Sequence, residues 1–354
     1  MRQQHTVDMT ALDDFDEIID VRSPAEFAFD RIPQAVNCPV LDDEERARVG
    51  TLYKQVSPFE ARKVGAALVA KNVARHIDLH FASRDERWRP LIYCWRGGKR
   101  SNSMAHVLRE IGWNAATLAG GYQTFRRAVL GQLEQLPSRL TFRVVCGPTG
   151  SGKSRLLQAL ATHGAQVLDL ELLAQHRGSV LGDMPGAAQP SQKMFESRLW
   201  HALRSLHPGT PVFIEAESRK IGNLRIPDKL LERMRDSACI RIEVPLEERV
   251  RFLVGEYGHF LSEPGWLKAK LLRLAALHSS VTVARWNAMI DACEWETLVS
   301  DLLRIHYDPA YARSTQDNYA RLAQTHALNI AGLQDKELAR AAMALCREQL
   351  ARTA

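Results

Sequence analysis

The sequence predicts an α/β protein made of two parallel-sheet domains, the second of which ends in a helical part. Short apolar strands alternate with amphipathic helices along the chain, and two of the strands run directly into glycine-containing loops that open helices, at residues 89–111 and 140–160. Strand, loop and helix in this alternation are typical of parallel sheets. At 354 residues and 45% hydrophobic composition, the chain has enough apolar material for two cores.

The first domain is predicted to cover residues 1–136. We expect its strands at residues 15–20, 89–93 and 114–118, because each is a short run rich in apolar side chains. Apolar residues at spacings of three and four follow the second strand and predict a helix that ends near Gly112.

The second domain is predicted to cover residues 137–354, because the stretch 131–138 is polar and carries a proline, as expected of a boundary. Its strands are expected at 140–146, 166–169 and 211–215. From about Glu247 onward the periodicity is mostly helical.

A phosphate-binding loop is predicted between the strand at 140–146 and the helix after it. Residues 147–154 read GPTGSGKS and match the pattern G-x-x-x-x-G-K-[ST] at every fixed position. In this loop the backbone N–H groups surround phosphate oxygens, Lys153 neutralises the outer phosphates, and Ser154 reaches a Mg²⁺ bound to them. The candidate phosphate-binding residues are Gly147, Thr149, Gly150, Ser151, Gly152, Lys153 and Ser154.

Acidic residues that follow the later strands are candidates for assisting this loop. Glu215 ends an apolar strand, where an acid often helps to hold Mg²⁺, and Glu217 and Asp169 are the next candidates. Each is equally well explained as a surface carboxylate at a strand end. Binding a diphosphate does not require hydrolysis of ATP, so the use of Mg²⁺ or of a nucleotide stays open.

The loop after the strand at 89–93 has the composition of a thiol-activating site. Cys94 is followed by Arg96, Gly97, Gly98 and Arg100. Inward-facing backbone N–H groups, a helix N-terminus and nearby cations lower the pKa of a thiol and also bind an anionic substrate. Ser101 is placed to cap the helix. The alternative interpretation is a buried thiol at a strand end, which is how most cysteines are used.

Composition limits the remaining possibilities. The six cysteines lie far apart without a C-x-x-C pair, and the start of the chain turns acidic where a secretory signal needs an apolar core, so we expect a cytoplasmic protein. The net charge of +6 is compatible with an RNA partner. We expect no metal site and no tightly bound cofactor. His76 and His80 have helical spacing but lack a third ligand. The candidate RNA-contacting clusters are Arg225, Lys229, Arg233 and Arg235, and Arg249 with Arg251.

The first domain resembles the rhodanese superfamily. The segments that carry the resemblance are DVRSPAEF at 20–27, IPQAVN at 32–37 and GGY at 120–122. Gln34 stands where that superfamily usually has glycine, and Asp30–Arg31 stands where Gly-His is common. The reactive loop has the spacing C-x5-R, one residue longer than in typical sulfurtransferases and similar to that of related cell-cycle phosphatases.

A rhodanese-like domain followed by a P-loop domain resembles the bacterial tRNA 2-selenouridine synthase family. Further matching segments lie in both domains: residues 41–46, 49–55, 93–98, 169–171, 176–179, 215–222 and 306–311. The resemblance implies that selenium replaces sulfur at C2 of the wobble uridine (U34) in Lys, Glu and Gln acceptor tRNAs carrying 2-thiouridine. It implies selenophosphate as the selenium donor and geranyl diphosphate as the donor of a transient S-geranyl group.

We therefore expect a division of labour. Cys94 attacks the selenium of selenophosphate and becomes a perselenide, while Arg96, Arg100 and the loop amides hold the phosphate. Lys153 and Ser154 hold the diphosphate of the geranyl donor. The alternatives are a rhodanese-type sulfurtransferase or a phosphatase coupled to a P-loop ATPase, and an inert rhodanese-like module that scaffolds an ATPase.

Overall fold

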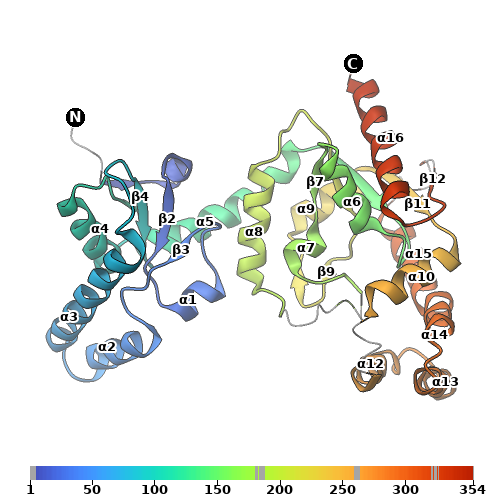
Figure 1. Cartoon of the computed structure of the whole chain (residues 1–354), viewed down its shortest axis with the longest axis horizontal. Coiled ribbons are helices and arrows are strands. Elements are labelled where there is room, and N and C mark those ends of the chain that lie inside the picture. Colours follow the sequence, from blue (N-terminus) through green and yellow to red (C-terminus); the bar gives the residue numbers. More distant parts are fainter. Residues whose placement is uncertain are drawn as a thin grey trace. The chain divides into compact units, whose positions relative to one another are not determined.

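A computed structural model describes residues 5–179, 182, 188–258, 264–319, 322, 325 and 327–353 (Figure 1). Its contacts divide the chain into two compact units. The first consists of Met1–Gln132 and Ser191–His201, and the second of Leu133–Pro190 and Ala202–Ala354. Both units have a parallel sheet with helices, so the predicted α/β fold class is confirmed.

The first unit is built on a five-stranded parallel sheet in the order β1-β5-β4-β2-β3. The predicted strands are present as β2, β4 and β5. The edge strands β1 and β3, of two residues each, were not predicted. The bounds are β1 Thr6–Val7, β2 Glu17–Asp20, β3 Val36–Asn37, β4 Pro90–Tyr93 and β5 Ala116–Leu118. All four residues of β4 are buried, as expected of the central strand of a parallel sheet.

Helices of the first unit pack on this sheet and supply the rest of its core. Met104, Ala105 and Leu108 of α4 join Ile19 and Ile92 from the strands in one buried cluster. The helix predicted after Cys94 is α4, and it ends at Gly112, whose left-handed conformation caps it. The bounds are α1 Pro24–Phe29, α2 Asp43–Gln55, α3 Pro58–His76, α4 Lys99–Ile111 and α5 Gly121–Leu133, with short 3-10 or π segments η1 Met9–Asp14 and η2 Ile77–Phe81. Helix α8, Gln192–Arg204, contributes to both units.

The second unit has its own five-stranded parallel sheet, in the order β12-β11-β6-β8-β7. The strands predicted at 140–146, 166–169 and 211–215 are β6, β7 and β8. Strands β11 and β12 were not predicted, and β12 lies in the region expected to be mostly helical. The bounds are β6 Phe142–Cys146, β7 Gln166–Leu168, β8 Val212–Glu215, β11 Ala238–Glu243 and β12 Ala327–Asn329, with a separate antiparallel pair β9 Lys220–Ile221 and β10 Leu224–Arg225.

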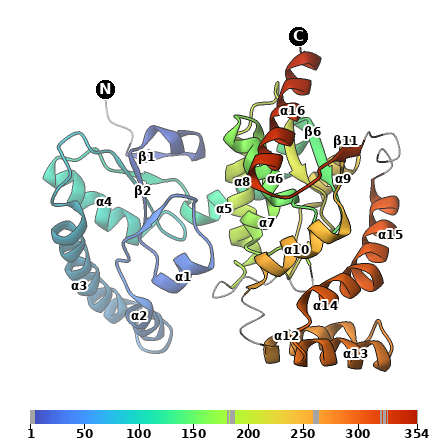
Figure 2. The ribbon, with the colours of Figure 1, turned by 45° about the vertical axis from the view of Figure 1, so that its right-hand side comes forward.

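Helices α6 and α16 cover one face of this second sheet (Figure 2). The part predicted to be mostly helical, from about Glu247, contains α10 and α12 to α16. Helices α12, α13 and α14 enclose a small core of their own around Trp286. The bounds are η3 Leu136–Arg139, α6 Lys153–Thr162, α7 Leu170–Ala174, α9 Asp228–Arg235, α10 Leu246–Glu256, α12 Pro264–Leu271, η4 Leu272–Leu274, α13 Ser280–Asp291, α14 Trp295–Leu302, η5 Leu303–Tyr307, α15 Asp308–Asn318 and α16 Asp335–Thr353. Among the described residues, none of the helices combines the length and apolar character needed to cross a membrane.

Candidate active sites

The cysteine loop lies at the carboxyl end of β4, the central strand of its sheet. Residues 95–98 turn back so that α4 begins at Lys99. The N-terminus of α5 closes the loop from the other side, because the N–H of Tyr122 donates to the Cys94 carbonyl at 2.9 Å and that of Gln123 donates to the Trp95 carbonyl at 3.1 Å. The carboxyl end of a parallel strand is where ligands bind in such sheets, so the loop is placed for chemistry.

Hydrogen bonds converge on the sulfur of Cys94. The N–H of Gly98 donates to Sγ at 3.2 Å, and the hydroxyl of Ser101 lies 3.3 Å from it. Burial raises the pKa of the Cys94 thiol. Hydrogen bonds from the Ser101 hydroxyl and from the N–H groups of Ser101, Gly98 and Arg96 together lower it by more than burial raises it. The pKa therefore lies below its ordinary value. These contacts favour a thiolate.

Ser101 does not cap α4 as expected. The N-cap position is occupied by Gly98, and the buried Ser101 hydroxyl lies between the Gly98 carbonyl, at 3.1 Å, and the Cys94 sulfur. Because the hydroxyl has a single proton, it donates to the carbonyl when Cys94 is a thiol and can turn to the sulfur when Cys94 is a thiolate. Ser101 therefore belongs to the reactive loop.

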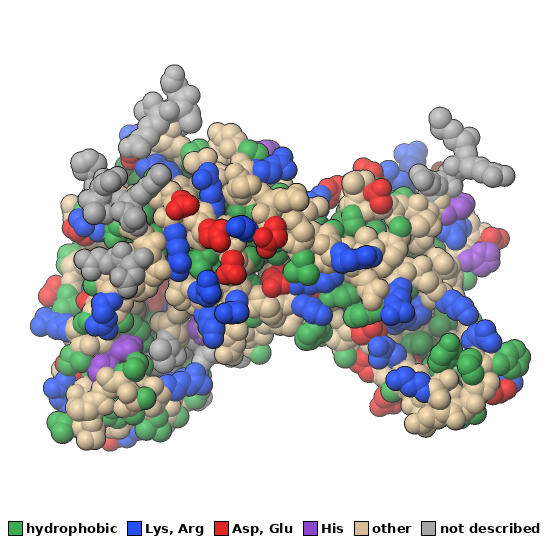
Figure 3. Space-filling view, turned by 180° about the vertical axis from the view of Figure 1, so that it is seen from behind, with side chains coloured by type: hydrophobic (Ala, Val, Ile, Leu, Met, Phe, Trp, Pro, Cys, Tyr) green, Lys and Arg blue, Asp and Glu red, His purple; other side chains and the backbone are tan. Residues whose placement is uncertain are grey.

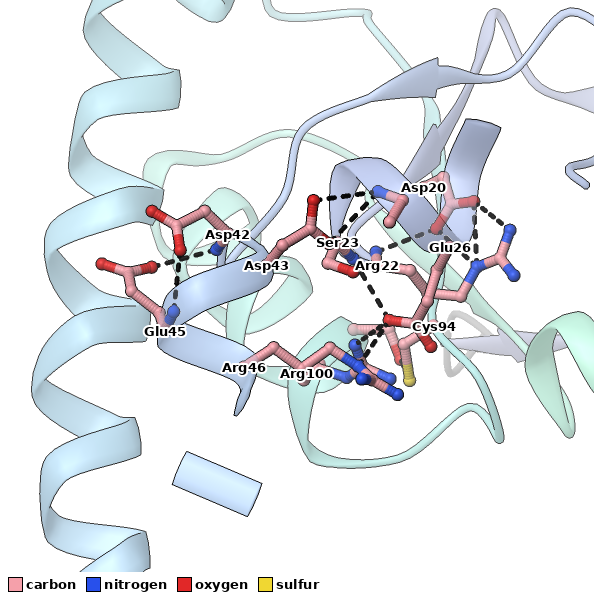
Figure 4. Close-up of polar contacts among 12 residues, drawn as sticks. Asp20, Arg22, Ser23, Glu26, Asp42, Asp43, Glu45, Arg46, Cys94 and Arg100 are labelled. Atoms are coloured by element: carbon pink, nitrogen blue, oxygen red, sulfur yellow. Dashed lines mark hydrogen bonds and ion pairs between the residues drawn. The ribbon is translucent and has the colours of Figure 1, made fainter. Parts of the chain in front are cut away.

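The two predicted arginines of the loop differ in their surroundings. The side chain of Arg96 is exposed, and only its backbone N–H contributes to the sulfur. Arg100 Nη1 pairs with Glu26 Oε2 at 3.0 Å, and Nε of Arg46 pairs with the same oxygen at 3.0 Å. Figure 4 shows both guanidinium groups directed at Glu26. Glu26 and Arg46 were not predicted as site residues.

The charged residues of the DVR segment, Asp20 and Arg22, form a buried polar cluster behind the loop. Arg22 donates to both carboxylate oxygens of Asp20, and its Nη2 donates to the Asp30 carbonyl at 2.7 Å. Its guanidinium lies 4.1 Å from the ring centroid of Tyr122, and the Tyr122 hydroxyl donates to Asp30 at 2.7 Å. These contacts join the carboxyl end of β2 to α5 beneath the loop. Because Arg22 is only 1% exposed, it is not available to a substrate.

The phosphate loop follows β6, which is likewise the central strand of its sheet. Lys153 begins α6, and its Nζ donates to the Gly147 carbonyl at 2.9 Å across the loop. The hydroxyl of Ser154 donates to Glu171 Oε2 at 2.7 Å. The residues from Thr149 to Ser154 line a cavity of about 430 Å³, so the predicted loop residues lie together, with Gly147 behind them.

The three predicted acids occupy different places around this cavity. Glu217 and Asp169 line it, whereas Glu215 is fully buried, with one oxygen accepting the N–H of Glu171 at 2.8 Å. Asp169 also caps α7 by accepting the N–H of Leu172. Glu171, a fourth acid that was not assigned a role, links this group to Ser154.

Burial and mutual repulsion raise the pKa values of three of these acids, Asp169, Glu215 and Glu217. Burial and the neighbouring Glu171 raise the pKa of Glu217 to about 8, although Lys153 opposes them. Burial and the charges of Asp169, Glu171 and Glu217 raise the pKa of Glu215 well above its usual range. Burial also raises the pKa of Asp169. These three carboxyls therefore hold a proton more readily than exposed acids do, and a nearby cation would favour their charged forms.

The residues present fit a Mg²⁺ ion that is completed by substrate. In the described part of the chain, no group of three His, Cys, Asp or Glu side chains has the spacing of a metal site. Mg²⁺ at phosphate sites is usually held by one or two carboxylates together with phosphate oxygens, and does not require three protein ligands. Ser154, Glu171 and Glu217 would supply the protein oxygens here, and the ion would neutralise charge on a departing diphosphate.

An apolar pocket adjoins the phosphate cavity. Its volume is about 70 Å³, and Leu253, Tyr257 and Tyr307 line both spaces. Its other walls come mainly from α12, α14 and η5, through Leu267, Trp295, Leu298, Val299, Leu302 and Leu303. A ligand with a phosphate head and a short apolar chain matches these two neighbouring spaces.

Comparisons with known proteins follow the same division of the chain. Residues 7–128 match the family model described as rhodanese-like domain, and residues 140–266 match the tRNA 2-selenouridine synthase AAA domain. The tRNA 2-selenouridine synthase of Marinobacter nauticus is 36% identical over 73% of this chain and 73% of its own length. The chain belongs to the tRNA 2-selenouridine synthase family.

Other members of the tRNA 2-selenouridine synthase family are similarly close. The synthase of Nitrosomonas europaea is 38% identical over 71% of this chain, and that of Nitrosomonas eutropha is 36% identical over 68%. The matched regions span 66% and 62% of those two relatives. Among solved structures, a rhodanese-related protein of Thermoplasma volcanium matches 35% of this chain at 15% identity, with a TM-score of 0.23.

The segment at 306–311, one of those that resemble the synthase family, contacts the phosphate loop. Asp308 pairs with Arg249 at 2.6 Å, and Arg249 donates twice to the Thr149 carbonyl, at 2.8 and 2.9 Å. Tyr311 lines the cavity, and the centroid of its ring lies 6.0 Å from Lys153 Nζ. This segment therefore braces the loop.

This brace corrects one of the expected RNA-contacting clusters. Arg249 is 5% exposed and holds the phosphate loop, so it does not belong to a solvated basic face. In the other cluster, Arg233 donates to the Leu140 carbonyl and Lys229 pairs with Glu232. On the face drawn in Figure 3, basic side chains are spread among acidic and neutral ones and do not form one patch.

Proposed function

We propose that this chain is a transferase that replaces the sulfur at C2 of wobble 2-thiouridine in tRNA with selenium, through an S-geranyl intermediate. Selenophosphate is the selenium donor and geranyl diphosphate is the prenyl donor. Family membership supports selenium modification of tRNA. The observation that carries the proposal is the presence, in one chain, of a cysteine loop whose backbone N–H groups stabilise a thiolate and of a separate P-loop cavity that adjoins an apolar pocket.

The second unit supports the geranyl step. The phosphate loop and Lys153 hold the diphosphate, and the apolar pocket receives the prenyl chain. The thiocarbonyl sulfur of the uridine attacks C1 of the geranyl group, and the C1–O bond breaks with its electron pair leaving on diphosphate. Positive charge from Lys153 and the loop amides stabilises that leaving group. Alkylation turns the sulfur into a thiol leaving group.

Electron balance decides what Cys94 does next. A thiolate that attacked the selenium of selenophosphate would expel phosphorus with the bonding pair, as phosphite, so the expected perselenide requires reduction of phosphorus. In the balanced route, the selenium of selenophosphate attacks C2 and geranyl thiol leaves. Cys94 then attacks phosphorus, the P–Se bond breaks towards selenium to give 2-selenouridine, and water hydrolyses the cysteine S–P bond to phosphate. The C-x5-R loop spacing suits attack at a phosphoryl group.

Two single variants test this division of labour. Cys94→Ser should still form S-geranyl-2-thiouridine but no 2-selenouridine, because only the thiolate step is lost. Lys153→Ala should reduce geranylation about a hundredfold, the usual effect of removing one group that stabilises developing charge. The nucleosides of thiouridine-containing tRNA, incubated with both donors, are measured by mass spectrometry. Loss of both products in Cys94→Ser, or normal geranylation in Lys153→Ala, would contradict the proposal.

A nucleotide control separates the proposal from a P-loop ATPase coupled to a sulfurtransferase or phosphatase. The wild-type protein should geranylate tRNA with geranyl diphosphate alone, without ATP. Product formation that depends on ATP, together with release of phosphate from ATP, would favour the coupled ATPase instead.

A further inference from the structure

Three donors meet on a single oxygen of Glu26 beside the reactive loop. Glu26 Oε2 accepts the N–H of Ser23 at 3.2 Å, in the capping box of α1, and it also accepts from Arg100 and Arg46 at 3.0 Å each. In the described residues, Glu26 is the one carboxylate paired with either arginine. One carboxylate therefore holds two guanidinium groups, which have five N–H donors each.

The position of Arg46 is fixed by its neighbours in the chain. Asp42 and Glu45 form a capping box at the start of α2, and Glu45 also accepts from Asn72 of α3 at 2.7 Å. Asp43 accepts the N–H of Ala25 at the start of α1, at 3.2 Å. These contacts tie the first turn of α2 to α1 and α3, so the backbone of Arg46 is rigidly placed although its side chain is 51% exposed.

The position of Arg100 connects this arginine pair with the sulfur. Arg100 directly precedes Ser101, whose hydroxyl contacts Cys94 Sγ. Figure 4 shows the two guanidinium groups converging on Glu26, on the side of the view where the Cys94 sulfur is drawn. The pair carries two positive charges against the single charge of Glu26, so the cluster has one positive charge in excess. Two arginines at one point match the oxygens of a tetrahedral oxyanion.

We infer that Arg46 is a second donor-binding arginine, which together with Arg100 holds the phosphoryl oxygens of the selenium donor next to Cys94. Glu26 is the positioning residue that keeps both guanidinium groups together. The inference rests on the proposed function only for the identity of the anion. The site itself is built for any tetrahedral oxyanion, including inorganic phosphate.

Protection of Cys94 by inorganic phosphate provides the test. The full chain is treated with iodoacetamide at neutral pH, and alkylation of the Cys94 peptide is followed by mass spectrometry as phosphate is titrated. Phosphate should slow the alkylation of wild-type Cys94. Arg46→Met should weaken this protection about tenfold, the effect of one lost charge-assisted hydrogen bond, and Arg46→Lys should restore part of it. Protection is expressed as the ratio of the alkylation rates with and without phosphate for each variant, so a change in the intrinsic rate of Cys94 does not enter the comparison.

Two further variants separate direct binding from a structural role. Arg48→Met removes the same charge from an exposed position of α2 and should leave protection unchanged. Glu26→Gln keeps one oxygen that can accept from Ser23, Arg46 and Arg100, so the arginines stay positioned, but it removes a competing negative charge. It should therefore bind phosphate at least as tightly as the wild type. A structural role of the cluster predicts weaker protection in Glu26→Gln as well as in Arg46→Met, and that result would overturn the inference.

Failure of this inference can be told apart from failure of the proposed function. If phosphate protection depends on Arg46 but no 2-selenouridine forms, the anion site stands and the proposed function falls. If 2-selenouridine forms normally and protection is equal in wild type and Arg46→Met, the inference falls alone. In the selenation assay, Arg46→Met should raise the KM for selenophosphate by a similar factor of about ten while geranylation is unchanged.

Discussion

The thiolate at Cys94 is stabilised mainly by directed hydrogen bonds. The largest lowering effects on its pKa come from Ser101 and from the N–H groups of Ser101, Gly98 and Arg96. Fixed dipoles of this kind need no rearrangement when charge develops, which is an advantage for a nucleophile. The arginines are therefore not needed to stabilise the thiolate and can bind the donor. The pairing of Arg100 with Glu26, and not with the sulfur, is consistent with this role.

Two adjacent glycines of the loop should respond differently to substitution. Gly97 has φ +64°, and a Cβ there would lie 2.6 Å from the Leu118 carbonyl and 2.9 Å from the Gly120 nitrogen. Gly98 has an ordinary φ and open space around a Cβ. Gly97→Ala should therefore lower the free energy of unfolding by about 1–3 kcal/mol and slow Cys94 alkylation, because the loop must deform.

Gly98→Ala is the matched control. It should change the free energy of unfolding by less than about 1 kcal/mol, since neither strain nor a clash is introduced. Chemical denaturation of both variants, with Cys94 alkylation rates alongside, measures the difference. Equal destabilisation by the two substitutions would show that the loop is not held by the backbone of β5 and α5 as described.

Sequence patterns predicted the residues that a local motif contains. Cys94 and Lys153 lie in short motifs whose residue spacing is typical of a reactive cysteine loop and of a phosphate-binding loop. Their roles could therefore be predicted without knowing which distant residues contact them. Glu26, Arg46 and Glu171 reach the sites from other elements, and their roles depend on how those elements pack. Each lies in a segment that matched a family pattern, which was the available signal, but a match does not say what a side chain touches.

At the level of elements, the brace between Arg249 and Asp308 connects three parts of the second unit. Arg249 comes from α10, Asp308 is the first residue of α15, and the Thr149 carbonyl belongs to the phosphate loop. Because Arg249 is nearly fully buried, its charge needs this partner. The helical part of the chain thereby helps to fix the loop geometry.

Loss of this brace should impair diphosphate binding. Asp308→Asn keeps the shape but removes the charge, and it should lower the free energy of unfolding by about 1–2 kcal/mol and raise the KM for geranyl diphosphate several-fold. Glu248→Gln breaks the ion pair with Arg251 on the same helix and provides the control, because that pair does not touch the loop. Thermal unfolding and steady-state geranylation measure both. An unchanged KM in Asp308→Asn would contradict the brace.

Elements with a strong local pattern were predicted, and those without one were missed. Strands β4, β6 and β8 are mostly apolar and buried, as parallel strands should be, with Arg143 and the terminal Glu215 as their charged residues. Strand β11 mixes buried and exposed residues and contains two charged side chains, and β12 is three residues long. Their strand conformation depends on pairing with β6 and with each other, which is a property of the assembled sheet.

At the scale of the whole molecule, each candidate site is complete within its own unit. Cys94, Arg100, Arg46 and Glu26 all belong to the first unit, and the phosphate loop, its acids and the apolar pocket all belong to the second. Each unit also has its own buried core. Two sites that share no residues can act in sequence on one tRNA, provided that the tRNA can move between them.

This independence leads to a prediction about mixed variants. Cys94→Ser retains the geranyl site and Lys153→Ala retains the thiolate site, so a mixture of the two proteins should form 2-selenouridine although neither does so efficiently alone. The geranylated tRNA released by the first variant becomes the substrate of the second. Product is quantified by nucleoside mass spectrometry at several protein concentrations. The blank is the double variant that carries both Cys94→Ser and Lys153→Ala. If the mixture yields no more product than the separate proteins, the intermediate must instead pass between the sites of a single chain without release.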